Sequence, residues 1–406
     1  MENVSSSNGL EKYPKLRFPG FEEPYRALCL GNIATSVNRT DPESMANIMM
    51  LSAGKGFIMQ SDKYSRDNAG QSLKKYILLK KGELAYNHGA SKAKQYGCCY
   101  ELLEDEARIP YVYHCFKIDE KEFTPYVALE LNNPKMDKQL KRLVSSSARM
   151  DGLLNISFDD YMSVRLTLPS YFEQMKIADF LNTIDRRIEL QRALVESLKK
   201  YKRGVIQHIF HSSSGVGWSY VKLGNIFKKA SRRNIDGKIK NVITNSAEYG
   251  LIPQRDFFDK NIAVDGNTLN YFVIKTGDFV YNPRKSNNAP YGPFNRYTLK
   301  DNGIISPLYT CLVLQADINP SYLAWYFKSD AWHRYIYDNG SQGVRHDRVS
   351  MTDDLLMGIP VAIPSADNQR KIARMLDTVE TRLLAFQSEY ALLEKVRKGF
   401  MQQLFI

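Results

Sequence analysis

The sequence predicts an α+β protein with two β-rich globular domains in a pseudo-two-fold arrangement, joined by two long antiparallel α-helices that form a coiled coil. The first observation behind this prediction is an internal repeat. Residues 169–210 align without a gap to residues 364–405, at an offset of 195 (364 minus 169). The second is the continuous helical spacing of apolar residues in both segments. A repeat of about half the chain indicates a duplicated domain and helix rather than a short solenoid unit.

The repeat is close in these two segments and looser before them. The closely repeated residues are Pro169, Ser170, Gln174, Lys176, Ile177, Ala178, Leu181, Thr183, Arg187, Leu198, Lys200, Gly204, Gln207 and Phe210, which recur as Pro364, Ser365, Gln369, Lys371, Ile372, Ala373, Leu376, Thr378, Arg382, Leu393, Lys395, Gly399, Gln402 and Phe405. Upstream, residues 30–33 match 223–226 (Leu-Gly-Asn-Ile in both), and residues 76–87 match 271–282. Small loop insertions explain the changing offset.

The repeat divides the chain into five parts. Residues 1–14 are a polar tail that we expect to be disordered, and residues 15–168 form the first β-rich domain. Residues 169–212 form the first long helix, residues 213–363 the second β-rich domain, and residues 364–406 the second long helix. We expect each part to be a separate structural element because the composition and the periodicity change at these boundaries.

Short apolar runs separated by turn residues predict the strands of the β-rich domains. In the second domain, residues 271–274 and 279–281 flank a Lys-Thr-Gly-Asp turn and predict two short strands. Residues 308–314 predict another strand, and residues 320–337 predict a short helix. The looser repeat predicts the same elements in the first domain.

The two long segments have an apolar residue at alternating spacings of four and three, the heptad pattern of a coiled coil. These seam positions are Ile177, Leu181, Ile184, Ile188, Gln191, Val195, Leu198, Lys202, Val205 and Ile209, and then Ile372, Leu376, Val379, Leu383, Phe386, Tyr390, Leu393, Arg397, Phe400 and Leu404. Ser170 with Glu173 predicts a capping box at the start of the first helix. A helix of this length reaches about 60 Å, and two such helices would bury their stripes against each other. A two-fold relation between the halves makes them antiparallel, with the β-rich domains at opposite ends.

The seam contains one cation in each helix, at equivalent positions. Lys202 and Arg397 are long enough to extend their charged ends past the edge of the helix interface.

The composition favours a basic protein without a membrane segment. The formal charge is +12 and the pI about 9.2, a balance that favours polyanions as partners. The five cysteines lack the spacing of a metal site. No apolar run approaches the roughly 20 residues of a membrane span, and no secretory signal is recognisable, so we expect a cytoplasmic location.

The sequence contains no recognisable catalytic, cofactor-binding or metal-binding motif. It has no P-loop, no GxGxxG after a strand and no Asn-Pro-Pro-[Tyr/Phe], the signature that a DNA aminomethyltransferase would need. The acidic pairs at 159–160 and 353–354 are duplicated just before the long helices, and we interpret them as capping or turn residues. We therefore predict no catalytic residues, no cofactor and no metal.

Polar loops after each duplicated Tyr-Asn pair are the best candidates for DNA contact. They keep their ends but change their content, as expected of two domains that read different sequences, and they are rich in side chains that bind bases and phosphates. An ordinary polar hairpin loop is the alternative. The candidate DNA-binding residues are Ser91, Lys92, Lys94 and Tyr96 in the first loop, Arg284, Lys285, Ser286, Asn287, Asn288 and Tyr291 in the second, and Arg149, Arg345 and His346 in the loops before the long helices.

Together these motifs resemble the specificity subunit of type I restriction-modification systems. The resemblance rests on the Leu-Arg-Phe-Pro-Gly-Phe start at residues 16–21, the repeated Leu-Gly-x-Ile, and the Gly-[Asp/Glu]-x-x-Tyr-Asn strand ends. It also rests on Ile-Ser-Pro-Leu-Tyr at residues 305–309 and on the Pro-Ser-x-x-x-Gln-x-Lys-Ile-Ala entry to each helix. It extends from about Lys15 to Phe405. The first loop departs from the second at residues 88–90, where His-Gly-Ala replaces Pro-Arg-Lys.

This resemblance implies a sequence-specific DNA-binding subunit without catalytic activity. In that family two target recognition domains, here residues 15–168 and 213–363, each read one half of a bipartite site in double-stranded DNA, and the helices set the spacer. The subunit docks two copies of an adenine methyltransferase subunit, and a restriction and motor subunit joins the complex. Two alternatives stay open: a self-contained DNA methyltransferase or nuclease, which the missing motifs disfavour, and a coiled-coil adaptor that ignores DNA, which the basic charge disfavours.

Overall fold

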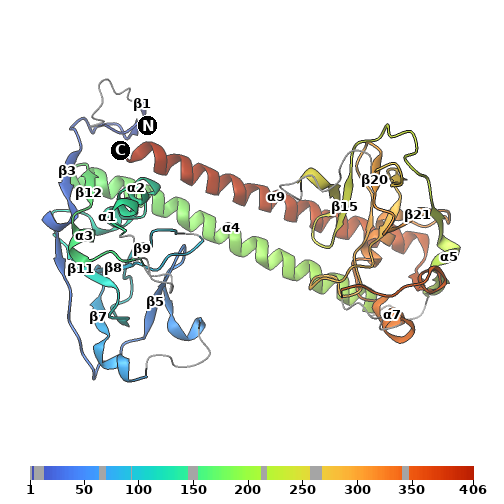
Figure 1. Cartoon of the computed structure of the whole chain (residues 1–406), viewed down its shortest axis with the longest axis horizontal. Helices are drawn as coiled ribbons and strands as arrows, with labels where there is room; N and C mark the ends of the chain where they lie inside the picture. Colours follow the sequence, from blue (N-terminus) through green and yellow to red (C-terminus); the bar gives the residue numbers. More distant parts are fainter. Residues whose placement is uncertain are drawn as a thin grey trace. The chain divides into compact units, whose positions relative to one another are not determined.

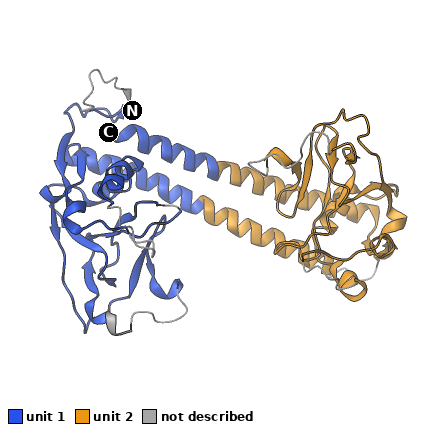
Figure 2. Cartoon of the chain, viewed as in Figure 1, with its two compact units in different colours: residues 1–190, 390–406 blue, residues 191–389 orange. Residues whose placement is uncertain are grey.

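The fold divides into two compact units, each with a β-rich domain and parts of both long helices. The computed structural model describes residues 2–3, 13–63, 70–92, 94–144, 154–211, 217–256, 268–340 and 347–406 (Figure 1). Unit 1 contains residues 1–190 and 390–406, and unit 2 contains residues 191–389 (Figure 2). Of the predicted polar tail 1–14, residues 1 and 4–12 lie outside the described residues.

Unit 1 is built on a four-stranded antiparallel sheet in the order β4-β11-β8-β9. Two-stranded pairs β1-β2, β3-β12, β5-β6 and β7-β10 surround it. Its strands are β1 Glu2–Asn3, β2 Leu16–Arg17, β3 Arg26–Cys29, β4 Ala34–Ser36, β5 Met49–Ser52, β6 Gly56–Met59, β7 Ile77–Lys80, β8 Leu84–Asn87, β9 Cys98–Glu101, β10 Glu106–Ile109, β11 His114–Ile118 and β12 Arg165–Leu168, and its short helices are α1 Thr124–Leu131, α2 Pro134–Leu143 and α3 Phe158–Met162.

Unit 2 repeats this topology except for the pair β1-β2, which has no counterpart in its described strands. Its four-stranded sheet has the order β14-β21-β18-β19, and the pairs β13-β22, β15-β16 and β17-β20 correspond to β3-β12, β5-β6 and β7-β10. Its strands are β13 Ser219–Lys222, β14 Phe227–Ala230, β15 Ile243–Ser246, β16 Gly250–Pro253, β17 Phe272–Ile274, β18 Phe279–Tyr281, β19 Phe294–Arg296, β20 Gly303–Ile305, β21 Thr310–Leu314 and β22 Pro360–Ile363, and its short helices are α5 Leu223–Ile226, α6 Pro320–Tyr326, α7 His333–Asn339 and α8 Asp353–Met357. The predicted α+β duplication is therefore confirmed.

Two local predictions in unit 2 need adjustment, whereas the two strands predicted at 271–274 and 279–281 are confirmed as β17 and β18. Strand β17 pairs with β20, and β18 pairs with β19 and β21. The strand predicted at 308–314 begins at Thr310. The single helix predicted at 320–337 is two helices, α6 and α7, because the chain turns at residues 327–332, where the Trp332 ring is buried in the core.

The two long helices, α4 Tyr171–His211 and α9 Ala366–Leu404, are continuous. In unit 1, Phe180 of α4 packs edge-on against Phe400 of α9, with ring centroids 4.9 Å apart. In unit 2, Gln191 Nε2 donates to the Phe386 carbonyl oxygen at 3.1 Å. In both units the predicted seam positions are buried or half-buried. In unit 1, contacts join position 180 to 400 and 185 to 397, and in unit 2 they join 191 to 386 and 202 to 380. The helices are therefore antiparallel, as predicted.

The cations of the seam are held by carboxylates of the facing helix. Lys202 Nζ donates to Glu380 Oε2 at 2.6 Å in unit 2, and Arg397 Nη2 donates to Asp185 Oδ2 at 2.9 Å in unit 1. The two pairs are equivalent, because positions 185 and 380 are also 195 residues apart. The charged ends thus find partners rather than extending freely into solvent.

The predicted capping box at the start of α4 is wrong. Both carboxylate oxygens of the buried Glu173 accept hydrogen bonds from Arg17, at 2.9 and 2.7 Å, and Oε1 also accepts one from the Tyr25 hydroxyl at 3.2 Å. A buried carboxylate needs such partners, and an arginine fork satisfies both oxygens at once. Glu173 therefore ties the start of α4 to the first strands of unit 1.

The duplicated acidic pairs, predicted to be capping or turn residues, lie instead in the first turn of short helices whose N-caps are Ser157 and Thr352. Asp159 and Asp160 lie in the first turn of α3, and Asp353 and Asp354 in the first turn of α8. Acidic side chains in the first turn stabilise a helix, because the backbone N–H groups there are unpaired and carry partial positive charge. None of the helices in the described part of the chain is both long and apolar enough to span a membrane.

Candidate nucleic-acid interface

Each unit contains one polar loop that follows a central strand of its four-stranded sheet. Loop 1 (residues 87–97) leads from β8 to β9 in unit 1, and loop 2 (residues 282–292) leads from β18 to β19 in unit 2. The candidates predicted in these loops therefore occupy the same place in the two topologies.

A buried tyrosine hydroxyl holds the far end of each loop. The Tyr86 hydroxyl donates to the Tyr96 carbonyl oxygen at 2.7 Å, and the Tyr281 hydroxyl donates to the Tyr291 carbonyl oxygen at 2.8 Å. Burial raises the pKa of both tyrosines above the ordinary value of 10.0, so the hydroxyls stay protonated and can donate. The position where each loop returns to its sheet is thereby fixed.

Three further hydrogen bonds recur in the two loops, and each joins equivalent atoms. They are Gly89 N to Asn87 Oδ1 (2.9 Å) and Arg284 N to Asn282 Oδ1 (3.0 Å), Leu154 N to His88 O (2.9 Å) and Val349 N to Pro283 O (2.8 Å), and Ser91 N to Lys94 O (2.9 Å) and Ser286 N to Ala289 O (3.0 Å). With the tyrosine bonds they form what we call the loop frame. It is the same in both units although most of the side chains differ.

Each loop closes at a glycine in the left-handed region. Gly97 has φ 84° and Gly292 has φ 83°. A Cβ atom at Gly97 would collide with the Asn87 carbonyl oxygen, and one at Gly292 with that of Asn282. Glycine is therefore required at both positions, for its backbone angle and for the close approach of the two ends of the loop.

The loop 1 candidates differ in how far they are available to a ligand. Ser91 and Lys92 are exposed, whereas Lys94 and Tyr96 are half-buried. Lys94 Nζ donates at 2.6 Å to the Asn132 carbonyl oxygen at the end of α1, and burial lowers the pKa of this lysine. Cations favour the C-terminal end of a helix, so Lys94 already has an intramolecular role.

Loop 2 presents more exposed polar side chains than loop 1. Arg284, Lys285, Ser286, Asn287 and Asn288 are all exposed. Reciprocal backbone bonds between Ser286 and Ala289, at 3.0 and 3.1 Å, place Asn287 and Asn288 at the tip of a tight turn. Arginine can pair with guanine and asparagine with adenine through two hydrogen bonds each.

A hollow of about 550 Å³ adjoins loop 2 and is lined by four of the predicted residues. Its walls include Lys285, Ser286, Asn287 and Tyr291 of the loop. The remaining walls come from elsewhere in unit 2 and include Tyr337, on α7, and Asp347. The structure thus brings these four candidates together, with an aromatic ring and a carboxylate beside them.

Sequence reasoning missed Asp347, which supports loop 2. Its carbonyl oxygen accepts from Lys285 N at 2.9 Å, and its carboxylate lies 3.9 Å from Arg284 Nε and 3.8 Å from Arg348 Nε. The one feature of the sequence that could have indicated Asp347 is its position immediately after the predicted residues Arg345 and His346. Arg149, Arg345 and His346 themselves lie outside the described residues.

The described ranges contain no cluster of three or more His, Cys, Asp or Glu side chains that could hold a metal ion. The loop frame instead combines buried hydrogen bonds with exposed amide, hydroxyl and cationic groups. Such an arrangement can present polar side chains in a fixed geometry, as a binding site requires. Binding of this kind does not depend on a chemically reactive side chain.

Comparisons with known proteins identify the fold. Neither a protein-family model nor a curated protein matches the sequence. The S subunit of a type I restriction-modification system from M. genitalium is similar over 97% of this chain and 99% of its own, with 15% sequence identity and a TM-score of 0.58.

Two further solved structures are similar. One, from work on complex assembly and conformational transition of the type I R-M system, covers 96% of this chain and 99% of its own, at 13% identity and a TM-score of 0.51. The HsdS subunit from Thermoanaerobacter tengcongensis covers 98% and 99%, at 15% identity and a TM-score of 0.46. The fold expected from the sequence resemblance is thus confirmed: two sheet-rich domains and two long helices, as in type I S subunits.

Proposed function

We propose that this chain is the specificity subunit of a type I restriction-modification complex and that loops 1 and 2 each read one half of a bipartite DNA site. The observation that carries the proposal is the loop frame, which is repeated bond for bond while the exposed side chains on it change. A constant frame with variable polar side chains is what two recognition sites need if they bind the same polymer in the same way but read different bases. The candidates in loops 1 and 2, together with Arg149, Arg345 and His346, remain our proposed contacts.

Loop 2 supplies the chemistry of direct readout. Arg284 and Asn287 offer fork-like hydrogen bonding to base edges, and Lys285 offers a phosphate contact. Loop 1 offers Ser91 and Lys92 as exposed groups. We therefore expect the half-site bound by unit 2 to depend more on arginine and asparagine contacts than the half-site bound by unit 1.

The long helices suit the role of a spacer ruler. α4 and α9 are continuous over 41 and 39 residues, and each contributes to both units. At 1.5 Å per residue each reaches about 60 Å. Major-groove segments recur about every 34 Å along one face of DNA, so a helix pair of this length can leave unread base pairs between two half-sites.

The remaining roles in the proposal belong to partner subunits. Two copies of an adenine methyltransferase subunit would dock on the two repeated units, and a restriction and motor subunit would join through them. In this proposal the chain itself is non-catalytic and holds no cofactor, consistent with the missing motifs. We place it in the cytoplasm, where its DNA would be.

A loop exchange tests the proposal. Residues 88–96 are replaced by residues 283–291, which leaves Asn87 and Gly97 in place and keeps the loop length. The chain is produced with the methyltransferase subunit of its host, and methylated adenines are mapped by single-molecule sequencing. We expect the sequence of one half-site to change while the other half-site and the spacer stay the same.

The control is the reciprocal exchange, which should alter the other half-site. Methylation of unchanged sites by both variants would contradict the assignment of loops 1 and 2 to base readout. Turnover of S-adenosylmethionine by the purified chain alone would favour the enzyme alternative. Binding to random duplex DNA that does not weaken with salt, or no binding at all, would favour the adaptor, because phosphate contacts make affinity fall steeply with salt.

A further inference from the structure

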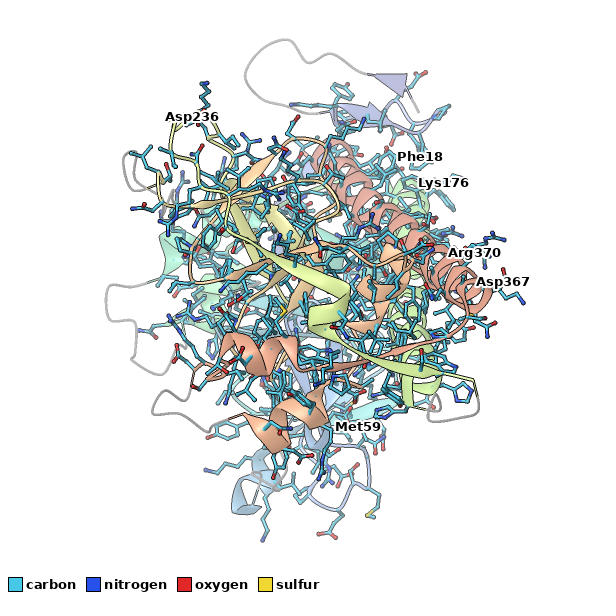
Figure 3. The ribbon with its side chains drawn as sticks, turned by 90° about the vertical axis from the view of Figure 1, so that its right-hand side faces the viewer. Phe18, Met59, Lys176, Asp236, Asp367 and Arg370 are labelled. Carbon is cyan, nitrogen blue, oxygen red and sulfur yellow. The ribbon has the colours of Figure 1, made fainter. Side chains whose placement is uncertain are left out.

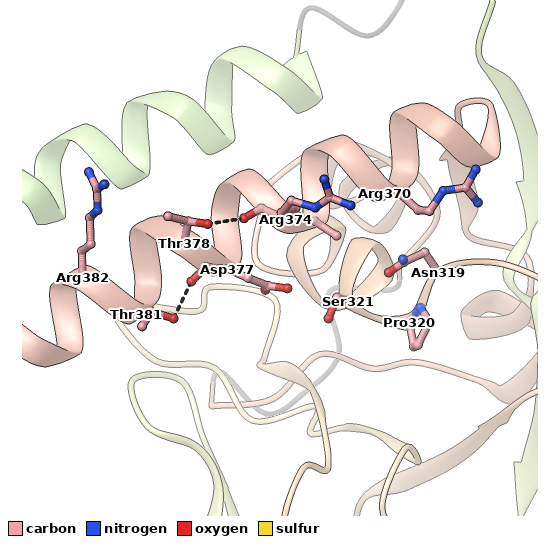
Figure 4. A pocket seen from close by; sticks show the side chains of 10 residues that line it. Asn319, Pro320, Ser321, Arg370, Arg374, Asp377, Thr378, Thr381 and Arg382 are labelled. Carbon is pink, nitrogen blue, oxygen red and sulfur yellow. Dashed lines mark hydrogen bonds between the residues drawn. The ribbon is translucent and has the colours of Figure 1, made fainter.

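Unit 2 contains a second hollow, of about 750 Å³, between the start of α6 and the exposed face of α9 (Figure 4). We call it the α9 hollow. Arg370, Arg374 and Arg382 project from α9 around it, and all three are exposed. Arg370 forms an exposed ion pair with Asp367 at the surface (Figure 3). For Arg374 and Arg382, no carboxylate lies within ion-pair distance among the described residues.

A fourth arginine lies behind this hollow. Arg296, at the end of β19, is half-buried and places Nη1 3.5 Å from the Ser321 hydroxyl, which lines the hollow. Its buried Nε has no hydrogen-bond partner in the described chain. Burial lowers the pKa of Arg296, and the nearby Asp377 opposes that effect. Arg296 therefore adds a further positive charge behind the hollow, with Asp377 as the nearby opposite charge.

The hollow also contains one fixed carboxylate. Asp377 accepts a hydrogen bond from Trp325 Nε1 at 2.7 Å, which holds it on the α6 side of the hollow (Figure 4). A ligand that fits must therefore offer anions to the arginines and a donor or a neutral group to Asp377. A continuous phosphate backbone would bring negative charge against this carboxylate, whereas a protein segment can alternate acidic and amide side chains.

Of the four arginines at this hollow, only Arg382 is repeated in unit 1, as Arg187. At the offset of 195, Arg370 corresponds to Met175 and Arg374 to Asp179. Arg296 corresponds to Glu101, and the strand registers confirm this match, because Arg296 pairs with Phe279 as Glu101 pairs with Leu84. Two of the four arginine positions are thus acidic in unit 1, although the helix entries are the most closely repeated part of the chain.

We propose that the α9 hollow is a docking site for an acidic segment of a partner protein and that unit 1 binds the same segment far more weakly. The docking site rests on the proposed function in one respect: the proposed function identifies the partner protein as the methyltransferase subunit. Arginine forks bind carboxylates through paired, charge-assisted hydrogen bonds. Two identical partner copies would then be held unequally, and the copy on unit 2 would carry an additional salt-sensitive contact.

The full chain is titrated with a fluorescein-labelled decapeptide of alternating Glu and Gln, and binding is followed by fluorescence anisotropy. We expect one site per chain, with an affinity that falls as salt is raised. Arg374→Asp should weaken binding about ten-fold or more, as expected for the loss of a charge-assisted hydrogen bond. Lys371→Ala is the matched control, since Lys371 is an exposed cation on α9 outside the hollow, and it should bind the peptide like the unmodified chain.

A gain of binding tests the asymmetry. Glu101→Arg combined with Asp179→Arg should add a second peptide site, with circular dichroism used to check folding. The proposal is overturned if Arg374→Asp binds the peptide as before. It is also overturned if Arg374→Asp weakens binding of a random DNA duplex as much as it weakens binding of the peptide, because the hollow would then take phosphates. The peptide titration uses neither a target sequence nor a methyltransferase, so its failure is distinguishable from failure of the proposed function.

Discussion

Glu130 should make unit 1 less stable as the pH rises. This residue lies near the end of α1 and is only 6% exposed. Burial raises the pKa of its carboxyl group from the ordinary 4.5 to about 8, while a backbone hydrogen bond from Thr167 and the charge of Lys135 act in the opposite direction. Its Oε2 has no hydrogen-bond partner in the described chain. The neutral acid is therefore the form that the fold prefers.

The sign and size of the effect follow from proton linkage. Between pH 4.5 and about 8 the folded chain holds a proton on Glu130 that the unfolded chain releases. The free energy of unfolding therefore falls as the pH rises through this window. A tenfold change in proton affinity is worth about 1.4 kcal/mol, so the full loss is at most about 5 kcal/mol. Local rearrangement around a buried charge reduces such penalties, and we expect roughly 2–3 kcal/mol.

Glu130→Gln removes the ionisation and keeps the shape of the side chain. We expect this variant to match the unmodified chain at pH 4, below the unfolded pKa, and to be more stable by roughly 2–3 kcal/mol at pH 8.5. Amide hydrogen exchange, read by mass spectrometry on peptides that contain α1, measures this difference in unit 1. Peptides that contain α6 report on unit 2 and should be unaffected. A stability difference that is the same at both pH values would show that ionisation of Glu130 does not destabilise unit 1.

Further predictions concern the loops and the helices. Gly292→Ala should destabilise unit 2 by about 2 kcal/mol or more, because the new Cβ meets the Asn282 carbonyl oxygen at positive φ; thermal unfolding followed by tryptophan fluorescence would measure this. Arg284→Ala should weaken specific DNA binding by about 1–3 kcal/mol and relax one base position, measured against a library of half-site variants. Lys202→Glu should destabilise the helix pair by about 1–2 kcal/mol, and adding Glu380→Lys should recover most of that in urea unfolding. One heptad inserted in both α4 and α9 should lengthen the permitted spacer by about three base pairs, since seven residues add about 10 Å; unchanged spacing in a methylation assay would contradict the ruler.

The architecture could be predicted because the sequence repeats most closely at positions where both copies need the same side chain for packing. The heptad stripe must be apolar along both helices, so it recurs and predicts the antiparallel pair. Lys202 and Arg397 recur at one seam position, and their partners Glu380 and Asp185 recur at an equivalent position beside the seam. Their pairing across the two helices could not be predicted, because the sequence shows where charged residues lie along a helix but not which opposite charge each one contacts.

Contacts between distant segments account for what the sequence did not reveal. Glu173 looked like a capping residue because its local spacing fits one, but its actual partner, Arg17, is 156 positions away. Lys94 remains a proposed DNA contact, but its local sequence did not show that its amine also donates to the carbonyl oxygen of Asn132, 38 positions away. Local spacing cannot predict such contacts, because a buried charge is satisfied by whichever group the fold brings within reach.

The loop frame explains why the two loops could diverge while their geometry stayed the same. Asn87 and Gly97 recur in loop 2 because the frame uses the amide side chain of one and the positive φ of the other. His88 is replaced by Pro283, and the bond at this position survives because only a main-chain carbonyl oxygen accepts it. Proline lacks an N–H but keeps that oxygen. Positions that serve the frame through the main chain can therefore change their side chains, and our proposal assigns the reading of different bases to exposed side chains at such positions.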